Sequence, residues 1–184
     1  MHKEPISSIV GLKALAWDFN NSVFTSPARP EFIWSPGGLQ MCECPKCGGE
    51  PKQNCTCGLY ATFKFGVAME YTQESIISPI FLTEASGVTH VYSEGFRSEE
   101  LTIHAVSPIN DSALAKLCAS QAADYFGIKI VPDYRVLWFF MDVLNLYTCK
   151  DTYVPALEAT KSLTGDSLDK VMQLIWRTLG ENPN

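Results

Sequence analysis

The chain has 184 residues, 46% hydrophobic and 18% charged, which is typical of a folded globular protein rather than a disordered one. Its formal net charge of −6 disfavours a broad nucleic-acid-binding surface, because affinity for phosphate backbones rests on clustered Lys and Arg. No stretch offers the roughly 18 uninterrupted apolar residues of a membrane-spanning helix, and no apolar signal core follows the N-terminus. We therefore expect a cytoplasmic protein without a membrane partner.

Strand and turn signals fill the first part of the chain. Over residues 11–26, large apolar side chains alternate with smaller or polar ones, and the Asn-Asn-Ser sequence at 20–22 supplies turn chemistry. We expect a β-hairpin there. A proline-containing connection leads to the apolar residues 32–34, and Ser-Pro-Gly-Gly at 35–38 predicts a turn.

Residues 59–71 fit two patterns. Apolar side chains alternate from Phe63 to Met69 as in a strand, and they also recur at every fourth residue from Leu59 as in a helix. We favour a helix, because Gly58 would end the preceding loop and the segment has the length of about three helical turns.

The next stretch reads as β-structure. Residues 76–82 are rich in β-branched and aromatic side chains, and Pro79 places this strand at an edge or a bulge. Residues 88–92 and 97–106 predict a hairpin around Ser-Glu-Gly at 93–95.

The C-terminal part predicts three helices and one short strand. We expect a capped helix over 110–127, a strand over 128–131, a helix over 133–147 and an amphipathic helix after 166–167. The apolar face of the first helix is expected to contain Leu114, Leu117, Cys118 and Ala122. The aromatic cluster at 138–140 is expected to pack in the core, with a partner surface as the alternative. The chain is thus predicted to be α+β, a single domain over 1–184 with mainly antiparallel sheet and about three helices.

The most informative stretch holds five of the seven cysteines within residues 42–57. Tetrahedral zinc sites are commonly built from two short-spaced cysteine pairs joined by a turn. Cys44-Pro-Lys-Cys47 and Cys55-Thr-Cys57 are such pairs, and neighbouring glycines suit tight turns. We predict a zinc-binding loop over 42–58 with these four thiolates as ligands and Cys42 as a fifth candidate.

Two other chemistries remain open for this stretch, an iron–sulfur cluster and a thiol redox site. A redox Cys-x-x-Cys usually lies between a strand and a helix, whereas Pro-Gly-Gly at 36–38 precedes this one. Four thiolates leave no open position on zinc for water, so the predicted site is structural rather than hydrolytic.

A second candidate site is polar. His90, Arg97, Glu99 and His104 lie in the predicted hairpin, where an exposed strand face is normally polar without a function. If Leu101 and its alternate neighbours face the core, His104 faces away from it and is open to a partner. These side chains are the group that an enzymatic role would use, but no catalytic residue is assigned.

Three motifs together resemble a group of bacterial and bacteriophage proteins of unassigned function: Trp-Ser-Pro-Gly at 34–37, Cys-Thr-Cys-Gly-Leu-Tyr-Ala at 55–61 and Gly-Phe-Arg-Ser-Glu at 95–99. The resemblance spans about residues 11–106 and implies no activity. Members of that group carry fewer cysteines before the Cys-x-Cys pair, sometimes with a histidine.

The functional hypothesis that follows is a zinc-stabilised binding or adaptor module with another protein as its partner. A closed metal site holds a protruding loop in one shape, which lowers the entropy lost on binding. The alternatives are a nucleic-acid-associated accessory factor that uses the zinc knuckle as a local basic contact, and an iron–sulfur or thiol redox protein.

Overall fold

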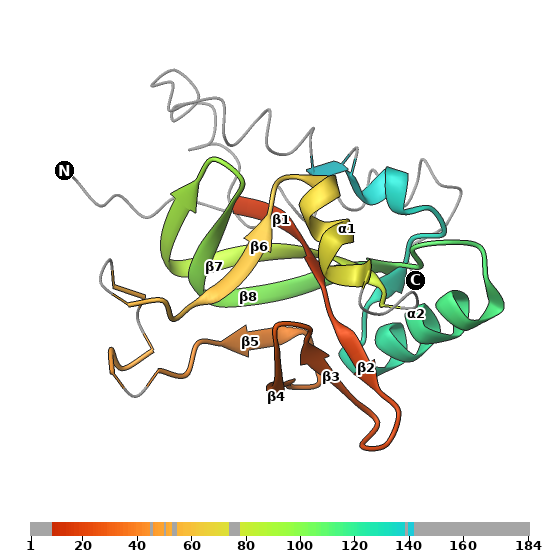
Figure 1. The fold of residues 1–184 in the computed structure, drawn as a ribbon, viewed down its shortest axis with the longest axis horizontal. Helices are drawn as coiled ribbons and strands as arrows, with labels where there is room; N and C mark the ends of the chain where they lie inside the picture. The colour runs from red at the N-terminus through yellow and green to blue at the C-terminus, as the bar shows by residue number, and fades with distance from the viewer. Residues whose placement is uncertain are drawn as a thin grey trace.

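A computed structural model describes residues 9–44, 46–49, 51–52, 55–73, 78–138 and 140–141. Two sheets and the helices beside them make up this part of the chain (Figure 1). The main sheet contains β1 (Ile9–Ala14), β5 (Leu39–Met41), β6 (Leu59–Thr62), β7 (Ile80–Tyr92), β8 (Gly95–Ser107) and β9 (Lys129–Ile130). The small sheet contains β2 (Ala16–Asp18), β3 (Val23–Ser26) and β4 (Arg29–Trp34). The helices are α1 (Phe65–Gln73) and α2 (Ala113–Phe126), and residues 134–138 and 140–141 are also helical.

The long hairpin β7–β8 organises the main sheet. Strand β8 pairs with β7 along its whole length and with β6, β5 and β9 along its other edge. Strand β1 pairs with both β6 and β7, so the pairings β8–β6–β1–β7–β8 close into a ring. All pairings are antiparallel except β8–β9. The predicted α+β class with mainly antiparallel sheet is confirmed.

The closure of this ring depends on a close approach at Gly95, the first residue of β8. A Cβ atom there would lie 2.8 Å from the Cα of Thr62 on β6, with the backbone of Ala61 equally crowded. Backbone atoms cannot move aside as the end of a flexible side chain does, so a glycine is required for the two strands to pair.

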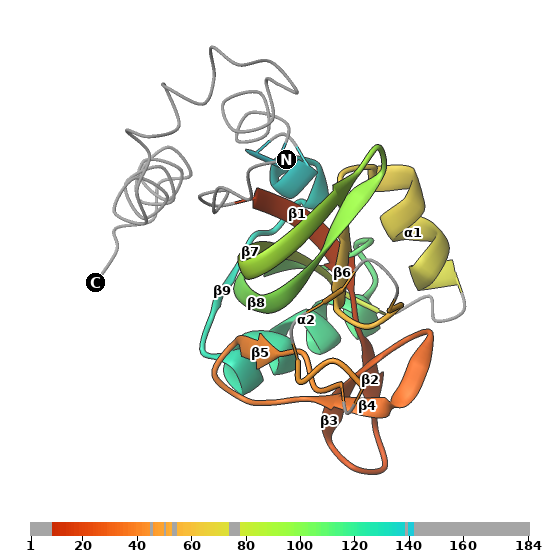
Figure 2. The same cartoon turned by 90° about the vertical axis from the view of Figure 1, so that its left-hand side faces the viewer.

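Two apolar clusters form on the two faces of β1. Ile9 joins one cluster with large aromatic side chains of β3, β4, β7 and α2, including Phe24, Trp34 and Phe126. Leu12 joins the other, which α1 and residues 134–141 cover. The alternation of side chains along a strand separates these two sets. Figure 2 shows the small sheet below the main sheet, with α1 beside it.

Most sequence predictions for these elements are confirmed. The hairpin within 11–26 is β2–β3, with Trp17 paired to Phe24, and the hairpin around 93–95 is β7–β8, longer than expected. The first predicted helix is α2, where the Ser112 side chain caps the Ala115 N–H and Gly127 ends the helix. The second helix begins at Tyr134, and its predicted end and the whole third helix lie outside the described residues.

Two local predictions are wrong. Residues 59–62 are strand β6 rather than the first turn of a helix, because they pair with β8 through hydrogen bonds that a local pattern cannot show. The helix begins only at Phe65. On α2, Leu114 and Leu117 are 45% and 50% exposed, since the helix packs through small side chains instead, including Ala115, Cys118 and Ala122.

In the helix that begins at Tyr134, one aromatic residue of the predicted cluster packs against the core and another is partly exposed. Leu137 and Met141 are fully buried and Phe140 packs against their cluster, whereas Trp138 is 43% exposed and its ring lies tilted, with its centre 5.9 Å from that of the Phe65 ring. The predicted core packing therefore holds for only part of the cluster among the described residues.

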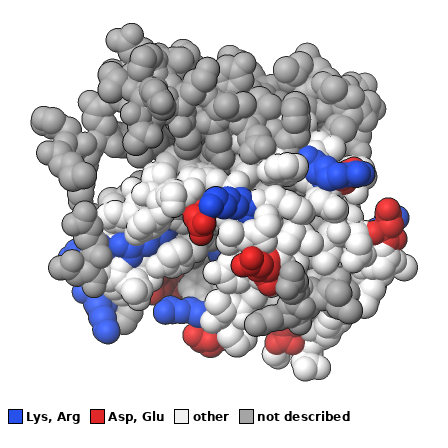
Figure 3. All heavy atoms as spheres, turned by 45° about the horizontal axis from the view of Figure 1, so that its top comes forward, with Lys and Arg blue, Asp and Glu red and all other residues white. Residues whose placement is uncertain are grey.

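Charge is mixed on the surface that Figure 3 shows. Lys and Arg lie interspersed with Asp and Glu over the described residues, without a continuous basic area on that face. None of the helices in the described part of the chain is both long and apolar enough to cross a membrane.

Candidate metal centre

Four cysteine thiols meet in the loop between β5 and β6. The sulfur atoms of Cys44, Cys47, Cys55 and Cys57 all lie within 4.8 Å of one another. Zinc–sulfur bonds of about 2.3 Å at tetrahedral angles require sulfur atoms about 3.8 Å apart. The Cys44 and Cys55 sulfurs are 3.7 Å apart and the Cys47 and Cys57 sulfurs 2.9 Å apart, so a metal would widen the second of these pairs and draw together any pair near the 4.8 Å limit. The donor set therefore fits a tetrahedral thiolate-binding metal.

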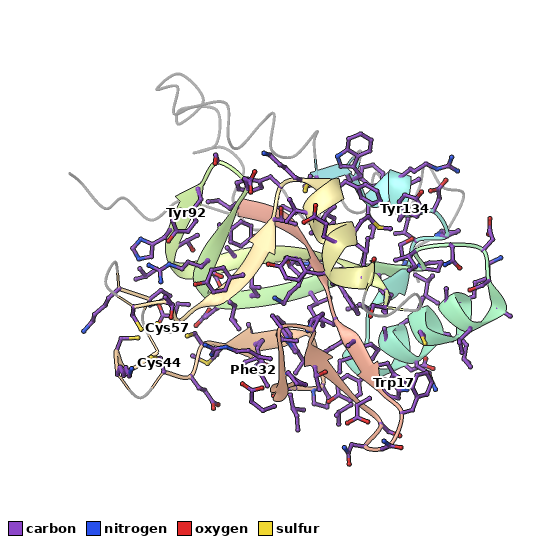
Figure 4. The ribbon with its side chains drawn as sticks, viewed as in Figure 1. Trp17, Phe32, Cys44, Cys57, Tyr92 and Tyr134 are labelled. Atoms are coloured by element: carbon purple, nitrogen blue, oxygen red, sulfur yellow. The ribbon has the colours of Figure 1, made fainter. Side chains whose placement is uncertain are left out.

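The first cysteine pair has the backbone of a metal-binding knuckle. The Cys44 carbonyl accepts hydrogen bonds from the N–H groups of Cys47 at 3.3 Å and Gly48 at 2.9 Å. Gly49 follows with a φ of 95°, and a Cβ there would lie 2.8 Å from the Cys42 carbonyl. This tight turn brings both thiols of the pair close to the second pair, and Figure 4 shows Cys44 and Cys57, one from each pair, beside each other.

Without a metal, the thiols share protons unequally. A hydrogen bond from the Cys47 thiol, followed by one from the Lys46 N–H, lowers the pKa of Cys44 to about 6. The hydrogen bond to Cys57 raises the pKa of Cys47 to about 12, and burial raises the pKa of Cys57 to about 11. Of these three thiols, Cys44 therefore loses its proton most readily. A divalent metal ion replaces those protons when it binds.

Arg97 holds the second cysteine pair from the sheet. Its side chain is only 4% exposed, and its guanidinium donates to the carbonyls of Cys55, Cys57 (3.1 Å) and Lys52 (2.9 Å). The N–H on Nε donates to the Tyr92 hydroxyl at 2.7 Å. A planar guanidinium satisfies several acceptors at once in a way that an ammonium group cannot. Strand β8 therefore holds the backbone of the loop at Lys52, Cys55 and Cys57.

His90 adds a further contact from β7. It is the cross-strand neighbour of Arg97, and its Nε2 donates to the Pro51 carbonyl at 2.7 Å. Together the two side chains of the β7–β8 hairpin bind the carbonyl groups of four loop residues, Pro51, Lys52, Cys55 and Cys57. The hairpin and the metal ligands form one unit.

Cys42 lies beside the group of four. It is 9% exposed, belongs to the first apolar cluster, and its N–H donates to the Glu99 carbonyl at 2.7 Å. Burial raises the pKa of its thiol, while a hydrogen bond from the Gly58 N–H acts in the opposite direction. Its backbone is thereby tied to β8 where the knuckle begins.

The polar residues predicted on the hairpin do not form one site. Arg97 and His90 bind the cysteine loop, whereas the Glu99 carboxylate accepts from the Val88 N–H at 3.1 Å. His104 lies far along β8 and is 2.7 Å from the Glu84 carboxylate, with both side chains about one-fifth exposed. The buried position of Arg97 was not expected, because a charged residue in a hairpin ordinarily faces water.

A cleft next to the metal centre has no counterpart in the sequence analysis. It has a volume of about 550 Å³, and the cysteine loop forms one of its walls with Cys42, Glu43 and residues 56–58. Lys13 of β1 lines it. A lysine at an inward position of an otherwise apolar strand was the only signal for it in the sequence.

The chain matches no protein-family model, no curated protein and no solved structure.

Proposed function

We propose that residues 42–58 bind one structural zinc ion, and that the chain is a binding module whose recognition surface this ion stabilises. The observation that supports the proposal is the convergence of four thiols within 4.8 Å on a loop that Arg97 and His90 already hold. Zinc is favoured over harder metals because thiolate is a soft ligand.

A structural role follows from the number of thiols. Four thiolates would occupy every position of a tetrahedral zinc ion, so that no site is left for water or substrate. The complex would carry a net charge of −2, and the buried guanidinium of Arg97 beside it offsets part of that charge. Lys46 and Lys52 on the same loop add to this effect.

The surroundings of the loop favour a protein partner. Strand β5 leads into the loop at the end of the main sheet and exposes half of Leu39 and half of Met41. Tyr60 and Tyr92 on the other side of the loop are 47% and 51% exposed. Aromatic residues and methionine are enriched at protein interfaces. The net charge of −6 and the interspersed charges of Figure 3 favour such a partner over nucleic acid.

Reduced thiols at the metal site also favour a reducing compartment, and we place the protein in the cytoplasm on this ground. No catalytic role is proposed for this site.

The first test is metal analysis of purified protein together with its absorption spectrum. We expect one zinc ion per chain and no visible colour. Replacing zinc with cobalt(II) should give the visible spectrum of a tetrahedral thiolate complex. Iron with a coloured spectrum, or a colourless protein without metal after purification under reducing conditions, would overturn the zinc assignment.

Variants separate ligands from neighbours. Cys47→Ser and Cys57→Ser should each lose most of the zinc, whereas Cys42→Ser and Cys118→Ser should retain it, because neither belongs to the group within 4.8 Å. The adaptor role predicts that partners captured by the zinc-loaded chain are lost after chelation. Unchanged folding and unchanged partner capture after zinc removal would count against it.

A further inference from the structure

The cleft beside the metal centre contains a lysine where the strand pattern calls for an apolar residue. Ile9, Gly11 and Lys13 share one face of β1, and the first two meet the first apolar cluster, with a Cβ at Gly11 lying 2.7 Å from the Phe96 ring. The Lys13 ammonium reaches the same cluster, 5.0 Å from the centre of the Trp34 ring. A charge on the inward face of a central strand is costly and marks a candidate functional site.

The ammonium group has few partners of its own. It donates to the Tyr60 carbonyl at 2.6 Å and lies over Trp34. Within the described residues, no carboxylate lies at ion-pair distance from it. Burial lowers the pKa of Lys13 to about 8, consistent with an ammonium group that lacks an acidic partner. Since an ammonium group has three N–H donors, two remain for a ligand.

The cleft has the size and lining of a small-ligand site. Its volume of about 550 Å³ lies within the range of roughly 300–1,000 Å³ found for such pockets. The β3–β4 turn with Phe32 forms one wall, α1 with Tyr71 another, and β6 with Tyr60 lies between them. Figure 2 shows the β3–β4 hairpin beneath α1, and Figure 4 shows Phe32 below the main sheet. The lining favours a ligand with an apolar or aromatic body.

Charge restricts the head group of that ligand. Four charged side chains line the cleft, two cations, Lys13 and the exposed Arg29, and two carboxylates, Glu43 and Glu94. Glu94 is paired with Lys64 at 2.7 Å, and because both side chains are exposed, this pairing offsets only part of the negative charge of Glu94. A doubly charged phosphate would meet repulsion from both acids, and its second charge would be left to Arg29, whose exposed side chain is screened by water and salt. A singly charged carboxylate matches the Lys13 ammonium, the less exposed of the two cations.

We propose that this cleft binds a carboxylate with an apolar or aromatic body, and that Lys13 binds its carboxyl group. The carboxylate belongs either to a free organic acid or to the C-terminus of a partner polypeptide. The proposal deepens the binding-module function, since the metal-bound loop would form a wall of the same cleft.

The test uses isothermal titration calorimetry on the zinc-analysed full chain. The probes are 3-phenylpropionate, its amide, and the N-acetylated tripeptide Ala-Ala-Phe with either a free or an amidated C-terminus. We expect at least tenfold weaker binding for each amide than for its acid, because only the acid pairs with Lys13. Tighter binding of the peptide indicates a C-terminus, and tighter binding of 3-phenylpropionate indicates a free acid. Equal binding of acids and amides, or no binding of either acid, would overturn the proposal.

Three lysine variants complete the design. Lys13→Met should abolish the preference for acid over amide, and Lys13→Arg should keep part of it. Lys116 is an exposed lysine on α2, so Lys116→Met should bind the probes as the wild type does. Lys13→Met removes a partly buried charge, so it should fold, and a thermal melt checks this. If the zinc-loaded chain binds neither acid, this refutes only the proposal that the cleft binds a carboxylate. A zinc-free chain that binds them through Lys13 refutes only the zinc assignment.

Discussion

Replacing Arg97 with methionine tests whether the sheet and the metal loop form one unit. The variant keeps most of the side-chain volume but removes the donors to three loop carbonyls and to the Tyr92 hydroxyl. Hydrogen bonds to charged groups contribute about 1.5–3 kcal/mol each. The loop lies near the surface, so water replaces part of this loss, and we take the equivalent of two bonds at the lower end, about 3 kcal/mol.

This loss should be visible in zinc affinity. In the wild type the guanidinium holds the backbone at Lys52, Cys55 and Cys57 in place before the metal binds, whereas in Arg97→Met the metal must order this backbone itself. Because about 1.4 kcal/mol corresponds to a tenfold change in a binding constant, zinc should bind about 100-fold more weakly. Competition with a chromophoric chelator at fixed pH and under reducing conditions measures this change.

Two further variants separate the causes. Arg97→Lys retains the charge, but a single ammonium group cannot reach every acceptor. Its zinc affinity should therefore fall between those of the wild type and Arg97→Met. Arg135→Met is the matched control, since its side chain is 74% exposed and pairs with Asp133 at the surface. It should leave zinc affinity unchanged. Equal zinc affinity of Arg97→Met and the wild type would show that the loop does not depend on the sheet.

Four other outcomes are expected. Chelation of the metal should lower the thermal unfolding midpoint, and zinc should protect Cys44, Cys47, Cys55 and Cys57 from alkylation as detected by mass spectrometry, since bound thiolates are unavailable. Lys13→Met should be more stable than the wild type at pH 7, and urea unfolding should show this difference in stability shrinking between pH 8 and 10.5. The reason is that burial lowers the pKa of Lys13 from 10.5 in the unfolded chain to about 8 in the folded one. Between these two values the unfolded wild-type chain binds more protons than the folded one, so wild-type stability rises with pH. A stability difference independent of pH would contradict that reading. Cys118→Ala should lower the free energy of unfolding by about 1 kcal/mol without changing the zinc content, because this thiol is fully buried on α2 away from the group; a loss of zinc would contradict it.

Local signals predicted several elements of this fold correctly. The Asn-Asn-Ser turn predicted the β2–β3 hairpin, and Ser112 and Gly127 marked the ends of α2, because turns and caps depend on residues close in sequence. Residues 59–62 were assigned to the wrong class, since their strand partners lie more than 30 residues away at 95–98. A local periodicity carries no information about such pairing.

The cysteine spacing by itself determined the two short pairs, Cys44 with Cys47 and Cys55 with Cys57, because each pair is joined by only one or two residues, and it left Cys42 as a fifth candidate that the structure places outside the group of four thiols. Only the tertiary structure decided what surrounds that group. The register of β7 with β8 places Arg97 and His90 against the loop carbonyls, and the face of β1 places Lys13 in the adjoining cleft. These contacts join residues about 40 positions apart, so strand register rather than sequence proximity turns a predicted surface arginine into a buried support of the metal loop.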